Sequence, residues 1–522
     1  MAPLLIILLS FPVQAQDLWK IYRKNEKVLM ILETKKVWEE RKFSDYKLSF
    51  ISRLKLVQNY TMEPMFPGAP SKSDAEKIYG FQPRYDLRNF YILGISPDEV
   101  ILKVYKSPFD FAESLRRASL GWGDLAIESV EPDLPLFAYP EITSLVSSDC
   151  PDKKHSPIDR AWSLRNMRIL QAWQYSEKRG FPSKGFGEKV GHPDTGYSDH
   201  IDLDDKALKK DKKNNFIEKD KLPKDPLEQS RTKLKQPGHG TATGSVIISR
   251  GDVTGSPPGN EEGGTTNPGK VTGVACEADL VPYRAIESVV RLTYGNIEKA
   301  IYKAVQDGCS IVSLSLGGLD HRALNAVMEH AIGNNVIVVA AAGNFTDGYV
   351  VYPARYPFCI GVAATNYQDK PWKGSAYGER VAVSAPGEAV WRALRSKPNE
   401  STEEVEPSCG TSYSTANVAG IAALWLAHHK RNELIKKFDN DTKLQFIFKN
   451  LLKQTARCPA GWDKKKYGAG IVDAEKLLKT NPEKVLKQAK EDYNEFSKTK
   501  KDSAETNLIE NQKMYYHIWG LR

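Results

Sequence analysis

The chain has 522 residues, of which 41% are hydrophobic and 27% charged, and it contains six cysteines. This composition excludes a wholly disordered chain and a small disulfide-stabilised domain, and it provides enough apolar residues for a large core with additional segments. The net charge is +9, but acidic residues lie among the basic ones. A nucleic-acid-binding surface concentrates its basic residues, so we expect no nucleic-acid partner.

The chain begins with an apolar stretch that resembles a secretory signal. Leu4–Leu9 form its centre, and Val13–Ala15 resemble the small-residue cleavage site of a signal peptide. No basic residue precedes Leu4, although secretory signals usually begin with one. The stretch is too short to span a bilayer, and no other segment approaches that length. We interpret residues 1–15 as a signal peptide and expect a secreted or cell-envelope protein without a transmembrane anchor.

Residues 16–150 predict an N-terminal α+β region. The pattern of residues 99–105 favours a strand, and residues 109–120 favour an amphipathic helix. A second strand is expected over residues 125–133. Together they predict a strand-helix-strand unit at about 99–137.

The next pattern places an acid at the end of a strand. Residues 189–191 predict a short strand leading to Asp194-Thr195-Gly196. Pro193 cannot donate a ladder hydrogen bond, so it should lie at the strand end or beside a bulge. His192 lies close to Asp194 along the chain, and we expect it to have a packing role. Residues 204–236 mix eleven basic with seven acidic residues, which predicts a solvated insertion open to proteolytic nicking.

Three further patterns supply a base, an amide and a nucleophile in turn. His239 begins a run of small residues, and the apolar strand expected at 336–342 is followed by Gly343 and Asn344. Ser412 follows a Gly-Thr turn and begins a helix expected to continue to about His429. A backbone N–H at a helix N-terminus can stabilise an oxyanion. These residue types together predict acyl-transfer chemistry.

The order Asp194, His239, Ser412 along the chain is the order of the subtilisin site. With the motifs above, the region from about Asp159 to about Lys479 resembles the subtilases, the subtilisin-like serine proteases. The resemblance implies an α/β fold with a mostly parallel central sheet flanked by helices, and a catalytic domain at 151–480. It implies a serine endopeptidase that cleaves polypeptide substrates, with Ser412 as nucleophile, His239 as base and Asp194 as the group that orients the base.

The resemblance also assigns residues around this triad. Asn344 would donate to the oxyanion, and the family's substrate-lining strand would contribute Ser315, Leu316 and Gly317. Val351 stands where the family often has a pocket-lining glycine, which favours small or medium side chains at P1. Asn344 begins an Asn-x-Thr sequon, so glycosylation there would block the oxyanion site.

The resemblance implies that residues 16–150 are a prosegment that occludes the site as an intramolecular inhibitor until cleavage within 138–156. A permanent N-terminal domain is the alternative. Residues 481–522 are charged and are expected to form a helical extension.

No cofactor is needed for this chemistry. Some subtilases hold structural Ca²⁺, and Asp202 resembles a ligand there, but Ca²⁺ takes six to eight oxygens, and one carboxylate does not define a site. The six cysteines fix no pairing. Cys409, three residues before Ser412, is expected to be a small buried residue; if it were a free thiol near the cleft, thiol reagents would inhibit the enzyme.

Two alternative functions remain from the sequence. One is an inactive subtilase fold used for binding, which would require a lost catalytic residue. The other is a processing protease of narrow specificity, which would require dedicated charges in its substrate pockets.

Overall fold

The computed structural model describes residues 28–38, 43–53, 60–95, 104–105, 107–133, 150–151, 156–157, 159–228, 236–251, 270–287, 290–291, 295–344, 346, 348–499 and 511. The expected signal peptide at 1–15 and most of the expected cleavage region at 138–156 lie outside these residues.

A six-stranded sheet in the order β12-β11-β10-β8-β5-β6 forms the centre of the molecule. Every neighbouring pair in this sheet is parallel, which confirms the expected α/β class. Its strands are rich in buried Val, Ile and Ala, as parallel strands covered on both faces require. The strands are β5 (Lys189–Asp194), β6 (Asp279–Arg284), β8 (Ile311–Leu314), β10 (Ile337–Ala341), β11 (Ile360–Thr365) and β12 (Val381–Pro386).

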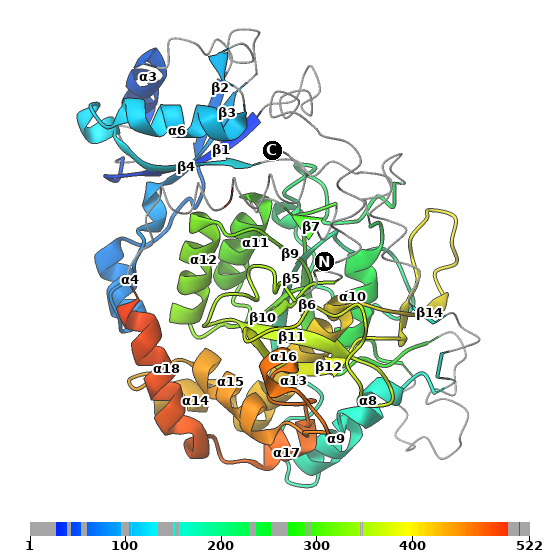
Figure 1. Ribbon diagram of the computed structural model, residues 1–522. Helices are drawn as coiled ribbons and strands as arrows, with labels where there is room; N and C mark the ends of the chain where they lie inside the picture. Colours follow the sequence, from blue (N-terminus) through cyan, green and yellow to red (C-terminus); the bar gives the residue numbers. More distant parts are fainter. Residues whose placement is uncertain are drawn as a thin grey trace.

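Helices cover the sheet on both sides (Figure 1). α11 (Gly295–Gln306) and α12 (Arg322–Gly333) pack against each other, and α10 (His239–Ile248) packs against α13 (Thr411–His429). All residues of α13 from Thr411 to His428 are buried. Small residues allow this close packing: a Cβ at Gly420 would lie 2.5 Å from Cβ of Val274.

The N-terminal region forms a separate four-stranded antiparallel sheet in the order β2-β3-β1-β4. Its strands are β1 (Val28–Thr34), β2 (Tyr60–Pro64), β3 (Phe90–Ile95) and β4 (Ile127–Asp133), and α6 (Pro108–Ser119) packs against β4. The expected helix and second strand are thus confirmed. Of the strand expected at 99–105, the structure describes Val104 and Tyr105, and neither is in a strand. β4 pairs instead with β1, whose largely buried, apolar sequence suits a central strand.

Residues 204–228 pair with and pack against the catalytic core more than their mixed charges predicted. Leu208 and Asn215 form bridges with Leu280 and Arg284 of β6, and Tyr197 forms another with Lys224. Burial of Leu208, Asn214 and Asp225 fixes this segment against the core. Many of its charged residues are nevertheless exposed, so nicking of this segment stays a prediction; residues 229–235 are not described.

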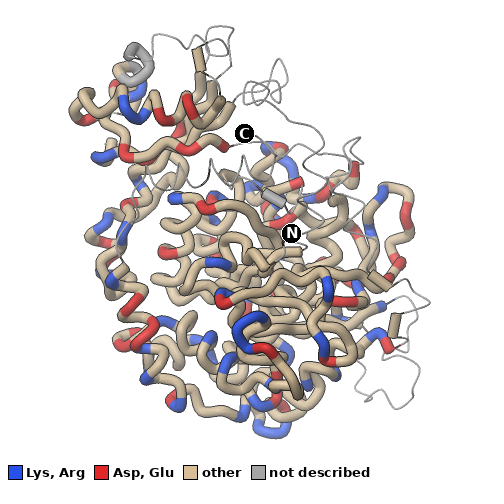
Figure 2. The backbone as a smooth tube through the Cα atoms, viewed as in Figure 1, with Lys and Arg blue, Asp and Glu red and all other residues tan. Residues whose placement is uncertain are grey.

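The C-terminal region is helical up to residue 499. It contains α14 (Arg431–Phe438), α15 (Leu444–Thr455), α16 (Lys464–Tyr467), α17 (Ala474–Lys479) and α18 (Leu486–Lys498). Figure 2 shows blue and red segments interspersed over the outer helices. None of the helices in the described part of the chain is long and apolar enough to cross a bilayer.

Candidate active site

Asp194 is the last residue of β5, at the carboxyl edge of the parallel sheet, where α/β proteins place their sites. β5 pairs with β8 only at Val190 and Gly191, and with β6 along its whole length. Pro193 therefore lies beyond the β8 pairing, at the strand end, as expected. The strand end leaves the Asp194 side chain free to face α10.

The Asp194 carboxylate holds the imidazole of His239. His239 Nδ1 lies 2.8 Å from Oδ1 and 3.0 Å from Oδ2 of Asp194, and the Thr195 N–H donates to Oδ1 at 2.7 Å. Asp194 is fully buried, and this burial alone would raise the pKa of its carboxyl. The charge and hydrogen bond of His239 outweigh the burial and lower the pKa, so the carboxylate stays ionised at neutral pH.

His192 packs next to the Asp194 carboxylate and is uncharged. Its Nε2 is 3.0 Å from Oγ1 of Thr243 and 3.7 Å from Oδ2 of Asp194. Complete burial lowers the pKa of His192, so its ring packs as a neutral group at neutral pH, in line with the expected role.

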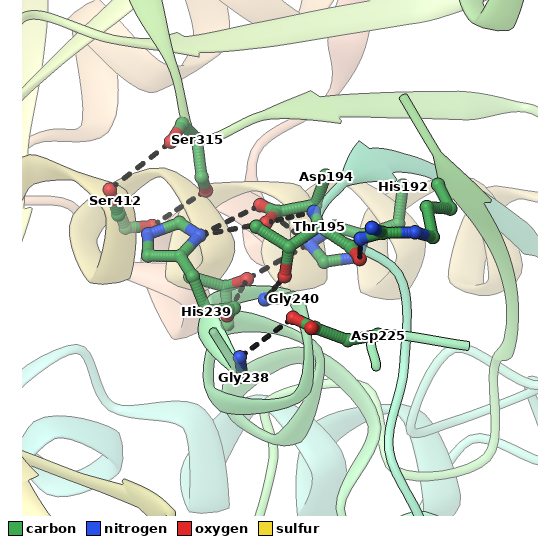
Figure 3. A network of polar contacts seen from close by, with 11 residues as sticks. His192, Asp194, Thr195, Asp225, Gly238, His239, Gly240, Ser315 and Ser412 are labelled. Atoms are coloured by element: carbon green, nitrogen blue, oxygen red, sulfur yellow. Dashed lines mark hydrogen bonds and ion pairs between the residues drawn. The ribbon is translucent and has the colours of Figure 1, made fainter. Parts of the chain in front are cut away.

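The chain that enters α10 is fixed by two side chains. Asp225 accepts a hydrogen bond from the Gly238 N–H at 2.7 Å, and Thr195 Oγ1 accepts one from the Gly240 N–H at 3.0 Å. Gly238 has φ +78°, and a Cβ there would lie 1.7 Å from the Arg395 carbonyl oxygen, so only glycine fits. Figure 3 shows both contacts next to His239. The sequence offered no signal for Asp225, which stood among the charges of the expected insertion.

Ser412 is the second residue of α13. Its hydroxyl donates to the Ser315 carbonyl at 3.3 Å, and the Ser315 hydroxyl donates to the Ser412 carbonyl at 3.0 Å. In Figure 3 the His239 imidazole lies between Asp194 and Ser412. The three residues predicted from separate motifs therefore meet at one place.

Asn344 and the start of α13 face the same small space. Asn344 Oδ1 accepts hydrogen bonds from the N–H of Thr411 at 3.0 Å and from its hydroxyl at 2.8 Å, which fixes the amide. A Cβ built on Gly410 would lie 3.5 Å from Asn344 Nδ2 and 3.7 Å from the Ser412 N. The side of Gly410 that lacks a side chain is thus bordered by both predicted oxyanion donors.

The predicted substrate strand lies beside Ser412 through Ser315. Ser315 and Leu316 are buried, and β9 (Gly317–Gly318) pairs with β7 (Val290–Arg291). Val351 lies between two glycines: a Cβ at Gly317 would be 2.0 Å from Val351 Cγ2, and one at Gly343 would be 3.1 Å from Val351 Cγ1. Its side chain therefore occupies space between the substrate strand and the loop that carries Asn344.

Cys409 is not a free thiol. It forms a disulfide with Cys150, with Cα atoms 5.6 Å apart across a sequence separation of 259 residues. The alternative of a free thiol near the cleft is therefore wrong, and the residue expected to be buried is only partly buried. Sequence spacing could not identify the pair, because the two cysteines approach each other only through the fold.

Asp202, the residue considered for Ca²⁺, is buried. Its oxygens accept hydrogen bonds from the Ser249 hydroxyl at 3.0 Å and from the Val271 N–H at 3.2 Å. Burial raises its pKa to about 6. Among the residues that the structure describes, no group of three or more His, Cys, Asp or Glu side chains is arranged to hold a metal ion.

Curated proteins similar to this chain are bacterial proteases. Thermitase from Thermoactinomyces vulgaris is 32% identical over 161 residues, covering 31% of this chain and 56% of that protein. Subtilisin NAT from Bacillus subtilis subsp. natto is 34% identical over 164 residues, covering 30% and 42%. Subtilisin DY from Bacillus licheniformis is 30% identical over 197 residues, covering 37% and 64%. The chain thus spans about half the length of these relatives.

Solved structures with a similar fold include proteases from Pseudoalteromonas arctica, with 23% identity, a TM-score of 0.47, and coverage of 62% of this chain and 99% of that chain. The MycP3 protease from the type VII secretion system has 22% identity, a TM-score of 0.45, and coverage of 64% and 93%.

The model of the Subtilase family matches residues 185–480, more than half of the chain. This range includes Asp194, His239, Asn344 and Ser412, the residues that the fold brings together. The chain belongs to the subtilase family.

Proposed function

We propose that this protein is a serine endopeptidase that hydrolyses peptide bonds through Asp194, His239 and Ser412. The observation that carries the proposal is the contact of His239 Nδ1 with the buried Asp194 carboxylate at 2.8 Å. This contact leaves Nε2 as the nitrogen available to a neighbouring serine. A buried acid, a base oriented by it and a serine at a helix N-terminus form the arrangement that acyl transfer requires.

In the proposed reaction the Ser412 hydroxyl attacks the substrate carbonyl while His239 Nε2 takes its proton. The hydroxyl turns from the Ser315 carbonyl toward the imidazole in this step; hydrogen bonds of this kind often tighten only when substrate is bound. Asp194 stabilises the imidazolium without becoming protonated. His239 then returns the proton to the leaving amine, and water hydrolyses the acyl-enzyme by the same steps in reverse.

Asn344 Nδ2 and the Ser412 N–H are the proposed donors to the tetrahedral oxyanion. Each such donor contributes about 3 to 4 kcal/mol to lowering the barrier. Asn344 is already oriented by Thr411, so no reorganisation is needed when charge develops on the oxygen.

Polypeptides are the proposed substrates, bound along Ser315, Leu316 and Gly317. Because Gly317 is paired with Val290, a peptide must pair through Ser315 and Leu316 or displace β7. Val351 fills space between Gly317 and Gly343, and this position supports a narrow P1 pocket that accepts small and medium side chains.

The proposal includes synthesis as a secreted zymogen, with residues 16–150 as the intramolecular inhibitor and cleavage within 138–156. Contact of β4 with the catalytic domain supports this arrangement, since Glu131 of β4 lies 2.9 Å from His321 next to α12. An inactive binding protein is less favoured, because Asp194, His239 and Ser412 are all present and brought together.

Labelling with a fluorophosphonate tests the proposal, because this reagent modifies activated serines. Once the chain has been cut between the expected prosegment and the catalytic domain, the protein should be labelled. The Ser412→Ala variant, treated in the same way, should not be labelled. Ser414→Ala is the matched control: Ser414 lies on the same helix, buried, with its hydroxyl donating to the Ala385 carbonyl. Equal labelling of folded Ser412→Ala and wild type would refute the assignment of the nucleophile.

A further inference from the structure

A pocket adjoins the start of α10, beside the residues of the proposed reaction. It has a volume of about 200 Å³ and is lined by Thr195, Asp225, Glu228, Pro237, Arg284 and Glu287. Thr195 follows Asp194, and Pro237 lies two residues before His239. In Figure 3 Thr195 and Asp225 both lie next to the turn that leads to His239. Sites for small molecules usually measure about 300 to 1,000 Å³, so this pocket suits a single side chain.

Arg284 is the basic residue in the lining, and its charge is already paired. Its Nε and Nη2 donate to the Glu218 carboxylate at 2.6 and 2.8 Å, and its Nη1 donates to the Thr195 carbonyl at 2.8 Å. Glu287 Oε1 lies 3.9 Å from Nη2, at the limit of an ion pair. Because Glu218 takes up the guanidinium charge, the three carboxylates in the lining leave the pocket negatively charged.

Asp225 and Glu228 form no ion pair with the part of the chain that the structure describes. Asp225 is only 7% exposed. Its oxygens accept hydrogen bonds from the N–H groups of Leu227 at 2.9 Å and Gly238 at 2.7 Å, which bring no full positive charge. Burial of a carboxylate without a cation is unfavourable. The wall of this pocket is therefore suited to a positive charge that a ligand brings.

The neighbours of the pocket identify which substrate side chain would reach it. Glu287 lies between β6 and β7, and β7 pairs with β9 at the end of the proposed substrate strand. The acyl part of a peptide bound along Ser315 and Leu316 therefore passes this pocket. Successive side chains of an extended peptide point to opposite faces. With P1 directed to the space at Val351, the side chain of P2, the second residue before the bond that is cut, points toward the side of His239.

We propose that this pocket selects a lysine or arginine side chain at P2 of the polypeptide substrate. The proposal rests on the proposed function, because a P2 residue exists only for a peptide that Ser412 cleaves. The exposed Glu228 and the half-buried Glu287 pair with the incoming ammonium or guanidinium group. Asp225 adds negative charge from the wall, and the same carboxylate holds the Gly238 N–H. The pocket thus joins substrate selection to the segment that carries the base.

The test measures kcat/KM for quenched fluorescent peptides that differ only at P2, with the enzyme cut as in the labelling experiment. Lysine, arginine, norleucine and glutamate are compared, because norleucine has nearly the shape of lysine without its charge. The lysine and arginine peptides should be cleaved at least about tenfold more efficiently than the norleucine peptide, and the glutamate peptide least efficiently. Raising NaCl from about 0.05 to about 0.5 M should reduce this preference, because salt screens the charges.

Variants of the lining then test where the preference arises. Glu228→Gln should lower kcat/KM for the lysine peptide by about threefold, because one exposed ion pair is lost, and Glu228→Lys should lower it further. Glu433→Gln is the matched control, since Glu433 is an exposed acid of α14 that does not line the pocket. Asp225 is left intact because it also fixes the chain before His239. If Glu228→Gln does not fold, Glu287→Gln makes the same test.

The outcomes separate this inference from the proposed function. Equal kcat/KM for lysine and norleucine at P2, in an enzyme that fluorophosphonate labels at Ser412, would overturn the inference and leave the protease assignment intact. An unchanged ratio of lysine to norleucine cleavage in folded Glu228→Gln and Glu287→Gln would also overturn it, since the preference would then arise elsewhere. Absence of both labelling and hydrolysis would overturn the proposed function and this inference together.

Discussion

The space beside Gly410 allows a direct test of the proposed oxyanion site. Gly410→Ala places a methyl group 3.5 Å from Asn344 Nδ2 and 3.7 Å from the Ser412 N, with the Tyr413 ring 3.8 Å away. These are ordinary van der Waals distances, and the backbone at Gly410 is extended, with φ 160°. The folded protein therefore has room for the methyl group, and the free energy of unfolding should change by less than about 1 kcal/mol.

The catalytic rate of Gly410→Ala should fall strongly, although its free energy of unfolding changes little. An oxyanion must lie about 2.7 to 3.1 Å from its donors, and the methyl group would stand on the side that both donors border. Losing one donor typically costs about 2.7 to 4 kcal/mol, so kcat should fall by at least about 10²-fold. The loss should appear in kcat more than in KM, because the contact forms only in the transition state.

The assay compares hydrolysis of a quenched fluorescent peptide by wild type and Gly410→Ala, both processed by the same external protease. Gly121→Ala is the control, because a Cβ at Gly121 meets nothing within 4 Å. Unfolding in guanidinium chloride confirms that each variant is folded. A folded Gly410→Ala enzyme with kcat within about threefold of wild type would refute the placement of the oxyanion.

Three further outcomes are expected. Val351→Gly should shift P1 preference toward large aromatic side chains in a peptide-library cleavage assay, and an unchanged profile would show that Val351 does not limit the pocket. Cys150→Ser should lower the free energy of unfolding by about 2 to 4 kcal/mol, measured with guanidinium chloride, because the disulfide closes a long loop; an unchanged midpoint would contradict this. Burial raises the pKa of Asp202 from 3.8 to about 6, so its contribution to stability is greatest below pH 3.8 and is lost as pH rises through about 6. Asp202→Asn in a chelating buffer should therefore gain stability relative to wild type between about pH 4.5 and about pH 7.5, by roughly 2 kcal/mol, and a pH-independent difference would contradict the shift.

The catalytic residues could be predicted because each stands at a local signal. Asp194 ends a short strand before a Thr-Gly pair, Asn344 comes shortly after an apolar strand, and Ser412 stands at the start of a run of small residues long enough for a buried helix. Such signals depend on neighbouring residues in the sequence. The fold then brings the residues that carry the signals to one edge of the sheet. The α/β class was implied by the resemblance of these motifs to the subtilases, and the parallel sheet confirms it.

The residues that support the site could not be predicted in this way. Asp225 holds the Gly238 N–H from within a charged stretch that has no distinctive pattern. The Cys150–Cys409 pair and the contact of Phe81 with Phe496 join segments hundreds of residues apart. Pattern and propensity describe neighbours along the chain, so contacts of this kind emerge only from the packed structure.

The Cys150–Cys409 disulfide makes it possible to locate the maturation cut along the chain. Cys150 lies inside the region 138–156 where the cut is expected. The disulfide bond therefore distinguishes a cut on the N-terminal side of Cys150 from a cut on its C-terminal side. A cut before Cys150 gives products that separate on a denaturing gel with or without reductant. A cut after Cys150 gives products that separate only after reduction, with the N-terminal chain anchored three residues from Ser412. A pair of gels, one reducing and one not, therefore shows on which side of Cys150 the chain is cut.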